Sequence, residues 1–304
     1  MKKTAILIGM LLLLTGCFHE MHELRPSEYG EGTAVGYMAT AISWELADDA
    51  GTSIHALTLS PCGSETSFTK NYFSVREAAG ELIQLPIGVY DVLTTANMTD
   101  ADGFTLAGLP ATKAFQPDVV VSLKNPVSSP AQAWFSITRA NIENDAITSV
   151  KPLLQRLLSS VSVNIYNVPA GATMVLTLSN VARSVTLTQK DANGRYGVRS
   201  ADSIGDLVLA TLTASSVGSL SLEGFTVLPT ASAFARCILT IDVTSASGNK
   251  TQCVCDAPPM ESGKAYTLEL DFTALKPYMF LDSYSISAWE DGWIISGEVL
   301  NPNE

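Results

Sequence analysis

Short stretches in which apolar and polar residues alternate run along most of this chain. The clearest are Val161 to Ile165, Ile241 to Thr244 and Tyr266 to Phe272; in the last, polar residues alternate with Leu268 and Leu270. Successive side chains of a β-strand point to opposite faces, so a period of two indicates a strand with one buried face. We therefore expect an all-β protein built of antiparallel strands.

Turn residues separate these stretches. Asp191 to Gly194, Ser247 to Asn249 and Glu290 to Gly292 lie beside strand-like runs, and Asp, Asn and Gly supply the positive φ angles of tight hairpins. Helical periodicity is sparse. Val150 to Ser159, with leucines on one face and a proline suited to the first turn, and Tyr72 to Ala79 are the two candidates. A few short helices are thus expected among many strands.

The first sixteen residues have the layout of a cleavable signal peptide. Lys2 and Lys3 precede an apolar run from Ala5 to Leu14. This run is about ten residues long, whereas roughly 20 are needed to cross a bilayer as a helix. The string Leu14-Thr15-Gly16-Cys17 resembles a bacterial lipobox, in which the peptidase cuts before a lipid-bearing cysteine. An ordinary signal peptide with an incidental cysteine is the alternative.

Lipid on Cys17 would hold the mature chain to a membrane. Each buried methylene contributes about 0.8 kcal/mol, and two or more acyl chains give stable anchoring where one does not. No later apolar run approaches the length of a membrane span. The lipid attached to Cys17 is therefore the predicted membrane contact.

The chain is long enough for two domains. Of 304 residues, 288 remain after removal of residues 1–16, and domains commonly have about 100–150 residues. We expect a signal peptide over 1–16, a lipidated polar tether over 17–32, and β-sandwich domains over 33–150 and 151–304.

The chain is acidic, and its charge excludes some partners. The formal charge of −12 becomes about −14 once Lys2 and Lys3 are removed with the leader. A strongly negative surface repels phosphates and anionic lipid headgroups. We therefore expect no binding to nucleic acid.

Four cysteines follow Cys17: Cys62, Cys237, Cys253 and Cys255. Cys253 and Cys255 are two residues apart, so on a strand both point to the same face. Buried thiols, a disulfide and a metal site are the three alternatives, and the last lacks a histidine nearby in sequence.

The sequence contains none of the common enzyme motifs: H-E-x-x-H, G-x-S-x-G, a phosphate loop and G-x-G-x-x-G are all absent. His19 and His22 are three apart in the tether, whereas a zincin needs two histidines four apart on a helix. His55 is the remaining candidate acid or base, and it lies in a strand-like stretch. The adjacent carboxylates Asp48-Asp49 and Glu290-Asp291 fit loops better than a glycosidase pair. We expect no catalytic residues, no metal and no cofactor.

Several short elements, taken in order, resemble the fimbrillin-like lipoproteins of Bacteroidales, the superfamily of the stalk, tip and anchor subunits of type V pili. They are the leader ending at Cys17, Ile42-Ser43-Trp44, Leu85-Pro86-Ile87-Gly88-Val89-Tyr90, Pro152-Leu153-Leu154-Gln155-Arg156 leading into Val161-Ser162-Val163, Ile286-Ser287-Ala288-Trp289 and Gly297-Glu298-Val299. The resemblance implies two tandem transthyretin-like β-sandwich domains and a role in pilus anchoring or assembly at the outer membrane. It also implies other pilus subunits as partners through β-strand addition.

In stalk subunits of this family an arginine-specific protease removes an N-terminal strand and leaves a groove for a neighbour's strand. Arg25 precedes proline, which makes a poor bond for such a protease, while Arg139 and Arg156 lie near the expected domain joint. An uncut chain keeps its lipid, as an anchor or accessory subunit would. A cut chain discards it.

Another interpretation is a surface lipoprotein that binds a glycan or host ligand outside a pilus. Aromatic rings stack on sugars, and the tryptophans available are Trp44, Trp134, Trp289 and Trp293. Core packing is the alternative role for each. A secreted hydrolase is a third interpretation, without a motif in its favour.

Overall fold

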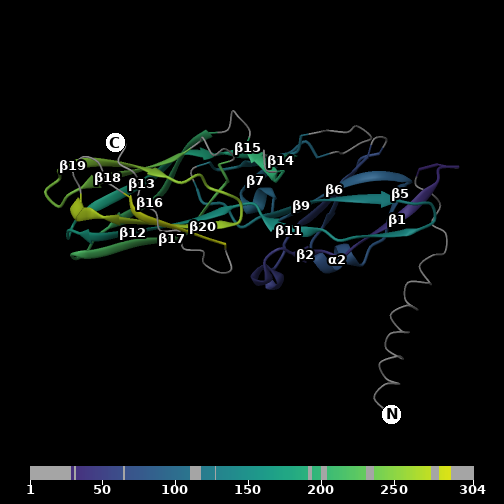
Figure 1. Ribbon diagram of the computed structural model, residues 1–304, viewed down its shortest axis with the longest axis horizontal. Coiled ribbons are helices and arrows are strands. Elements are labelled where there is room, and N and C mark those ends of the chain that lie inside the picture. The colour runs from purple at the N-terminus through teal and green to yellow at the C-terminus, as the bar shows by residue number, and fades with distance from the viewer. Residues whose placement is uncertain are drawn as a thin grey trace, which may run out of the picture.

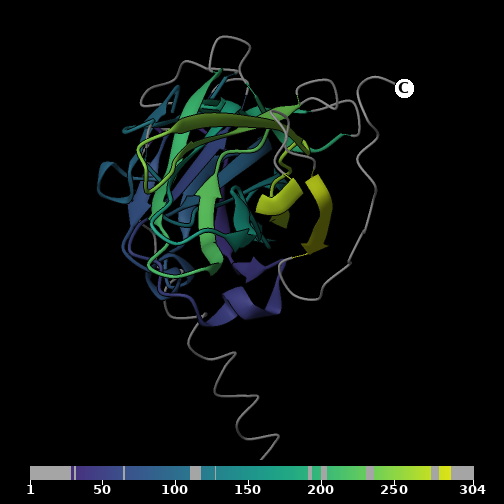
Figure 2. The same cartoon turned by 90° about the vertical axis from the view of Figure 1, so that its left-hand side faces the viewer.

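The structure is a computed structural model that describes residues 29–30, 32–63, 66–109, 118–126, 128–190, 194–199, 204–230, 236–274 and 281–288. Two lobes lie end to end along the long axis (Figure 1). Viewed along that axis they largely overlap, so the lobes are nearly coaxial (Figure 2). No helix in the described ranges is long and apolar enough to cross a membrane.

The C-lobe is a sandwich of two four-stranded sheets, ordered β17-β12-β20-β21 and β16-β13-β18-β19. Its strands are β12 (Ser159–Val168), β13 (Thr173–Ala182), β16 (Ile204–Thr213), β17 (Gly218–Val227), β18 (Cys237–Thr244), β19 (Lys250–Ala257), β20 (Lys264–Asp271) and β21 (Leu281–Ala288). Alternate residues such as Val161, Val163 and Leu268 are fully buried between the sheets. The strands expected from alternation are confirmed, and this is the order of a transthyretin-like sandwich.

The N-lobe packs a three-stranded sheet, β10-β1-β5, against a six-stranded sheet, β2-β11-β9-β6-β3-β4. Its strands are β1 (Val35–Thr40), β2 (Ser43–Trp44), β3 (Leu57–Cys62), β4 (Lys70–Tyr72), β5 (Ile83–Pro86), β6 (Gly88–Ala96), β9 (Trp134–Ile142), β10 (Ile147–Val150) and β11 (Leu153–Arg156). Met38, Leu59 and Ile142 lie in its buried core. The short helices in the described ranges are η2 (Ala47–Gly51), α2 (Val75–Ala79) and η3 (Asp100–Asp102), all in the N-terminal half, and η4 (Phe272–Ala274), which follows β20 of the C-lobe.

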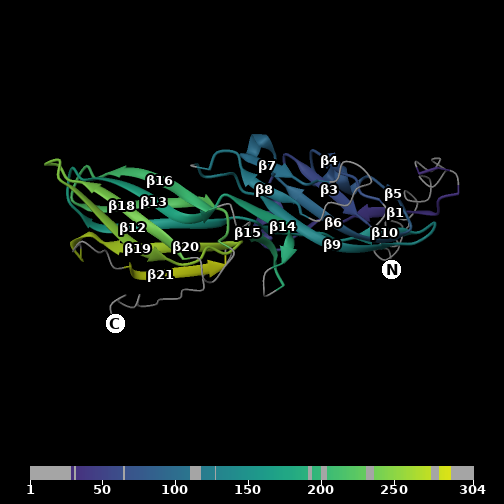
Figure 3. The same ribbon diagram turned by 90° about the horizontal axis from the view of Figure 1, so that it is seen from above.

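A further sheet, β15-β14-β8-β7, joins the two halves of the chain and lies beside the lobe boundary (Figure 3). Its strands are β7 (Phe104–Ala107), β8 (Val120–Leu123), β14 (Ser184–Lys190) and β15 (Tyr196–Arg199). β8 pairs with β14. A separate apolar cluster under this sheet mixes Phe104 and Phe135 with Leu157, Leu187 and Leu228. We call this cluster and its surrounding contacts the joint.

Among the strand pairs of the described residues most are antiparallel, as expected, but three are parallel. They are β1 with β10, β2 with β11, and β12 with β20. Each parallel pair joins strands that are about 100 residues apart in sequence. Strands joined by a hairpin are antiparallel, so a parallel neighbour must come from a more distant part of the chain.

The helix predicted over Val150 to Ser159 is wrong. β10 ends at Val150, Leu153–Arg156 forms β11, and β12 begins at Ser159. Burial within β11 alternates strictly, with Leu153 exposed and Leu154 buried, which is the period of a strand. β11 pairs with β2 and β9 of the N-lobe, and β12 pairs with β17 and β20 of the C-lobe.

The helix predicted over Tyr72 to Ala79 is confirmed over its second half as α2, which begins after the N-cap Ser74. Gly248, with φ +84°, lies in the expected turn between β18 and β19. Gly194, with φ +80°, lies between β14 and β15, while residues 191–193 are outside the described ranges. The turn expected at Glu290 to Gly292 is also outside them.

Candidate functional site: the docked N-terminal segment and the joint

The first strand of the folded part, β1, lies between β10 and β5. Tyr37 to Thr40 pair with Ile147 to Val150, and Val35 to Met38 pair with Ile83 to Pro86. Met38 is fully buried in the core of the N-lobe. The Thr40 hydroxyl donates to the carbonyl oxygen of Ala78 at 3.1 Å. The segment that follows the expected tether is therefore an integral strand of the N-lobe.

The parallel pairing continues from β1–β10 into β2–β11. Four backbone hydrogen bonds of 2.8–2.9 Å run from the N–H groups of Tyr37, Ala41, Ser43 and Glu45 to the carbonyl oxygens of Ala146, Val150, Pro152 and Leu154. The last three donors, Ala41, Ser43 and Glu45, are each two residues apart, as in a regular parallel ladder. One continuous ladder thus ties residues 37–45 to residues 146–154.

A buried ion pair closes the inner end of this ladder. Asp49 in η2 accepts from Arg156 of β11, with Oδ1 2.6 Å from Nη2, and Nε lies 2.9 Å from Oδ2. The side chains are 3% and 8% exposed. The indole Nε1 of Trp134 also donates to Asp49, at 3.0 Å. A buried charge persists only when it is paired and hydrogen-bonded, so these three residues hold η2 against β11 and β9.

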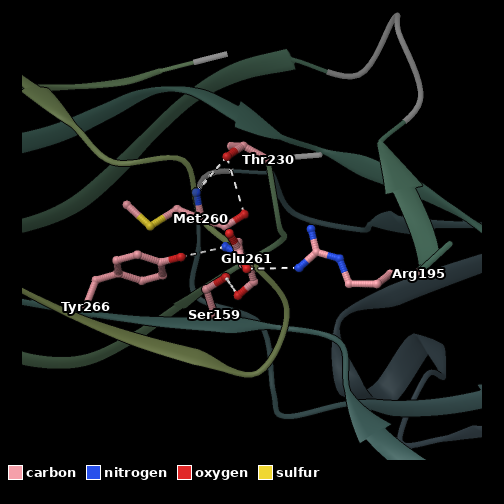
Figure 4. A network of polar contacts seen from close by, with 6 residues as sticks. All are labelled: Ser159, Arg195, Thr230, Met260, Glu261 and Tyr266. Carbon is pink, nitrogen blue, oxygen red and sulfur yellow. Dashed lines mark hydrogen bonds and ion pairs between the residues drawn. The ribbon is translucent and has the colours of Figure 1, made fainter. Parts of the chain in front are cut away.

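The connection between β19 and β20 is fastened to the joint by a polar network (Figure 4). Its members are Ser159, Arg195, Thr230, Met260, Glu261 and Tyr266. The backbone carbonyl oxygen of Glu261 accepts a hydrogen bond from the Ser159 hydroxyl at 2.7 Å. The carboxylate of Glu261 pairs with the guanidinium of Arg195 at 2.9 Å. Its N–H donates to the Tyr266 hydroxyl at 2.9 Å, and burial raises the pKa of that phenol. Glu261 therefore connects β12, the turn between β14 and β15, and β20.

A second group of contacts at the joint involves Thr226 of β17. The Thr226 N–H donates to the Ser129 hydroxyl at 2.9 Å, and the Thr226 hydroxyl donates to the carbonyl oxygen of Pro130 at 2.6 Å. Together with the β8–β14 pairing, these bonds link a loop of the N-terminal half to β17. The two lobes are held by hydrogen bonds around a shared apolar core.

The C-lobe also presents strand edges. Within the described residues, β17, β21, β16 and β19 each end a sheet. An edge strand leaves backbone N–H and C=O groups available to a strand of another chain. β17 is ten residues long and contains a single charged residue, Glu223. Its edge has few of the charges that normally discourage strand addition.

The candidate cleavage sites lie in paired backbone. Arg139 is in β9, opposite Asp91 of β6, and Arg156 is in the buried ion pair. A trypsin-like protease needs an accessible backbone that is not held in a sheet. Arg25 and Cys17, like His19 and His22, lie outside the described residues.

Two of the four tryptophans can be placed, and both contribute to the N-lobe core. Trp134 is 2% exposed, and Trp44 packs edge-to-face on it with ring centroids 5.6 Å apart. Trp44 is half-buried against this core, so both described tryptophans contribute to packing in the N-lobe. Trp289 and Trp293 lie outside the described residues.

All four described cysteines are thiols. Cys237, Cys253 and Cys255 are buried in the C-lobe interior, and Cys62 is half-buried in the N-lobe. Cys253 and Cys255 share the inward face of β19, as expected. Burial, with Asp256 and Cys253 nearby, raises the pKa of Cys255 to about 12. In the described ranges, no three His, Cys, Asp or Glu side chains come together as metal ligands.

The other candidate catalytic residues are not brought together. Asp48 is exposed, whereas Asp49 is committed to Arg156. His55 is exposed in the bend before β3 and does not lie within a strand. Its backbone N–H donates to the side-chain oxygen of Asn97 at 3.0 Å. Glu290 and Asp291 lie outside the described residues.

Sequence reasoning missed the partnership of Asp49 with Arg156. The residues are 107 positions apart, and no local pattern links them. The available signal was an arginine within the apolar stretch 152–158, since a charged residue among leucines needs a partner when it is buried.

The model of the family described as fimbrillin-A associated anchor proteins Mfa1 and Mfa2 matches residues 33–294. Among solved structures, the fimbrial anchor protein Mfa2 from Porphyromonas gingivalis is 13% identical, with a TM-score of 0.54, covering 83% of this chain and 96% of that one. An adhesin candidate from Bacteroides thetaiotaomicron is 11% identical, with a TM-score of 0.53, covering 88% and 98%. These likenesses show a shared fold. A sequence search of curated proteins finds no match.

Proposed function

The chain belongs to the family of fimbrillin-A associated anchor proteins Mfa1 and Mfa2, and we propose that within this fimbrial role it is an anchor or accessory subunit held at the outer membrane by lipid on Cys17. Residues 1–16 are then a signal peptide, and residues 17–32 tether the folded body. Catalysis is not part of the proposal.

The observation that carries the proposal is the docking of β1 in the N-lobe. Arg139 and Arg156, the candidate cleavage sites that can be placed, lie in paired or buried backbone. A protease acting on the folded protein would have to open the six-stranded sheet before it reached either bond. An intact chain keeps β1, the tether and the lipid on one polypeptide, as a membrane anchor requires.

The sheet edges that the described residues form in the C-lobe support association with other fimbrial subunits by strand addition. β17 and β21 lie at the two edges of one sheet, and β16 and β19 lie at the edges of the other. Backbone pairing at such an edge provides affinity, while side-chain pockets provide selectivity. The partner would contribute an extended strand.

The mass of the mature cell-surface protein tests the proposal. We expect one species that begins at Cys17 and carries the mass of attached lipid. A species that begins after Arg139 or Arg156 would contradict an anchor role, and an unmodified Cys17 would contradict lipid attachment. The matched control is Cys17→Ser, which should yield a species without the mass of lipid that still carries residues 1–16, because the peptidase cuts before a lipid-bearing cysteine.

Fimbrial association is tested separately by co-purification with a high-mass, heat-resistant polymer. Recovery only as a monomer from cells that carry fimbriae would count against subunit status. Glycan binding has no observation in its favour among the residues that can be placed, because Trp44 and Trp134 pack on each other.

A further inference from the structure

The N-terminal segment is in direct contact with strands that lie far from it along the chain. Along the chain, Asp49 and Arg156 are separated by 107 positions that include most of the N-lobe. In space, the ladder from Tyr37 to Glu45 and the ion pair join the entering segment directly to β10 and β11. β11 leads after two residues into β12 of the C-lobe.

The direction of these strands matters for any pulling force. β1 and β2 run parallel to β10 and β11, which continue toward the C-lobe. The entry to β1 is therefore at the outer end of the N-lobe (Figure 1). A force between the tether and the C-lobe acts along the strand axis, so it loads all the ladder hydrogen bonds together instead of one after another.

We infer that residues 35–49 form a mechanical clamp: the parallel ladder transmits tension in shear to β10–β11, and the Asp49–Arg156 pair is the stop at its inner end. The inference takes only the direction of the force from the proposed function. Asp49 is suited to this task because three donor groups from Arg156 and Trp134 hold it in a buried position. If the segment slides outward, Asp49 leaves its site beside Arg156. The charge of Arg156 then stays buried without this carboxylate, which costs free energy.

The N-lobe core adds to the resistance. Met38 is fully buried, and Trp44 packs on Trp134. On the other side of β1, the antiparallel ladder with β5 lies along the same axis. Sliding β1 therefore breaks two ladders and removes apolar side chains from the core in one step.

Single-molecule pulling of the purified, unlipidated mature chain tests the clamp in two geometries. One handle replaces the lipid at the N-terminus. For shear, the second is a ligation tag inserted after Ser216, in the exposed turn between β16 and β17. For unzipping, the tag is inserted after Asn144, in the exposed turn between β9 and β10 at the outer end of the N-lobe. We expect the first rupture force to be several-fold higher in shear.

The variant Asp49→Asn should lower the shear force markedly and leave the unzipping force unchanged, because unzipping breaks the outermost bonds before it reaches residue 49. A merely structural role would weaken both geometries. Asp100→Asn is the matched control, because it removes the exposed Lys124–Asp100 pair, which lies outside the clamp.

Equal forces in the two geometries, or an unchanged shear force in Asp49→Asn, would overturn the inference. If Asp49→Asn does not fold, the two geometries measured on the unaltered protein still decide it. The pulling results and the test of the proposed function can fail separately. Loss of the N-terminal segment on cells would refute the anchor role, but it would not change the rupture forces measured on the purified protein.

Discussion

The substitution Asp49→Ala should cost more stability than any exposed charge change in this protein. It removes the carboxylate that pairs with Arg156, whose side chain is 8% exposed, and it deprives the Trp134 indole of this acceptor. Breaking a buried ion pair by removing one partner typically costs about 3–5 kcal/mol, since the remaining charge stays buried. Domains are stable by only about 5–15 kcal/mol, so the loss is a large fraction of the whole.

Urea unfolding followed by tryptophan fluorescence measures this effect, because Trp134 donates to Asp49 and Trp44 packs on Trp134. The control is Asp100→Ala, which breaks an exposed pair and should cost no more than about 1 kcal/mol. The double variant Asp49→Leu with Arg156→Met should recover much of the loss, because apolar residues of similar size often replace a buried pair at little cost.

Two results would refute this reasoning. A loss below about 1 kcal/mol in Asp49→Ala would mean that the pair is solvated or that Arg156 readily finds water, because an exposed pair costs no more than that. A double variant that is no more stable than Asp49→Ala would mean that the stranded charge is not the source of the penalty.

Three further predictions use separate parts of the molecule. At pH 8 the thiolate fraction of Cys255 should be about 10⁻⁴, since its pKa is raised to about 12. Only the thiolate reacts, so alkylation of Cys255, measured by mass spectrometry, should be far slower in the folded protein than in urea. Equal rates would contradict the burial of Cys255. Gly36→Ala places a Cβ against the carbonyl oxygen of Glu143 and should lower the urea-unfolding free energy by about 1–3 kcal/mol, whereas Gly218→Ala, whose Cβ would meet nothing within 4 Å, should not. Limited digestion with an arginine-specific protease should leave the bond after Arg139 intact, because β9 is paired with β6 there; rapid cleavage at that bond would show that the sheet opens.

The joint makes the two lobes depend on each other. Leu157 and Leu228 share one apolar cluster with Phe104 and Phe135, and β8 is completed by β14 from the other half of the chain. A fragment that ends near residue 150 would lose these contacts and expose apolar surface. Truncation is therefore a poor way to study either lobe alone, and the tests above use the whole mature chain.

Local pattern was enough to predict the strands but not their partners. Alternation located the strands around Val163, Val243 and Leu268 and predicted the shared face of Cys253 and Cys255, because a half-buried strand needs a period of two wherever it lies. The resemblance of short motifs supplied the family and the tandem sandwich.

The tertiary structure decided what periodicity leaves open. The apolar stretch 152–158 satisfies a helical spacing as well as a strand, and only its place between β2 and β9 makes it β11. The parallel ladder from β1 to β10, the β8–β14 pairing and the Asp49–Arg156 contact all join residues that are distant in sequence. A periodic pattern reports that one face of a segment is buried, but the identity of the surface that buries it depends on the packing of the whole chain.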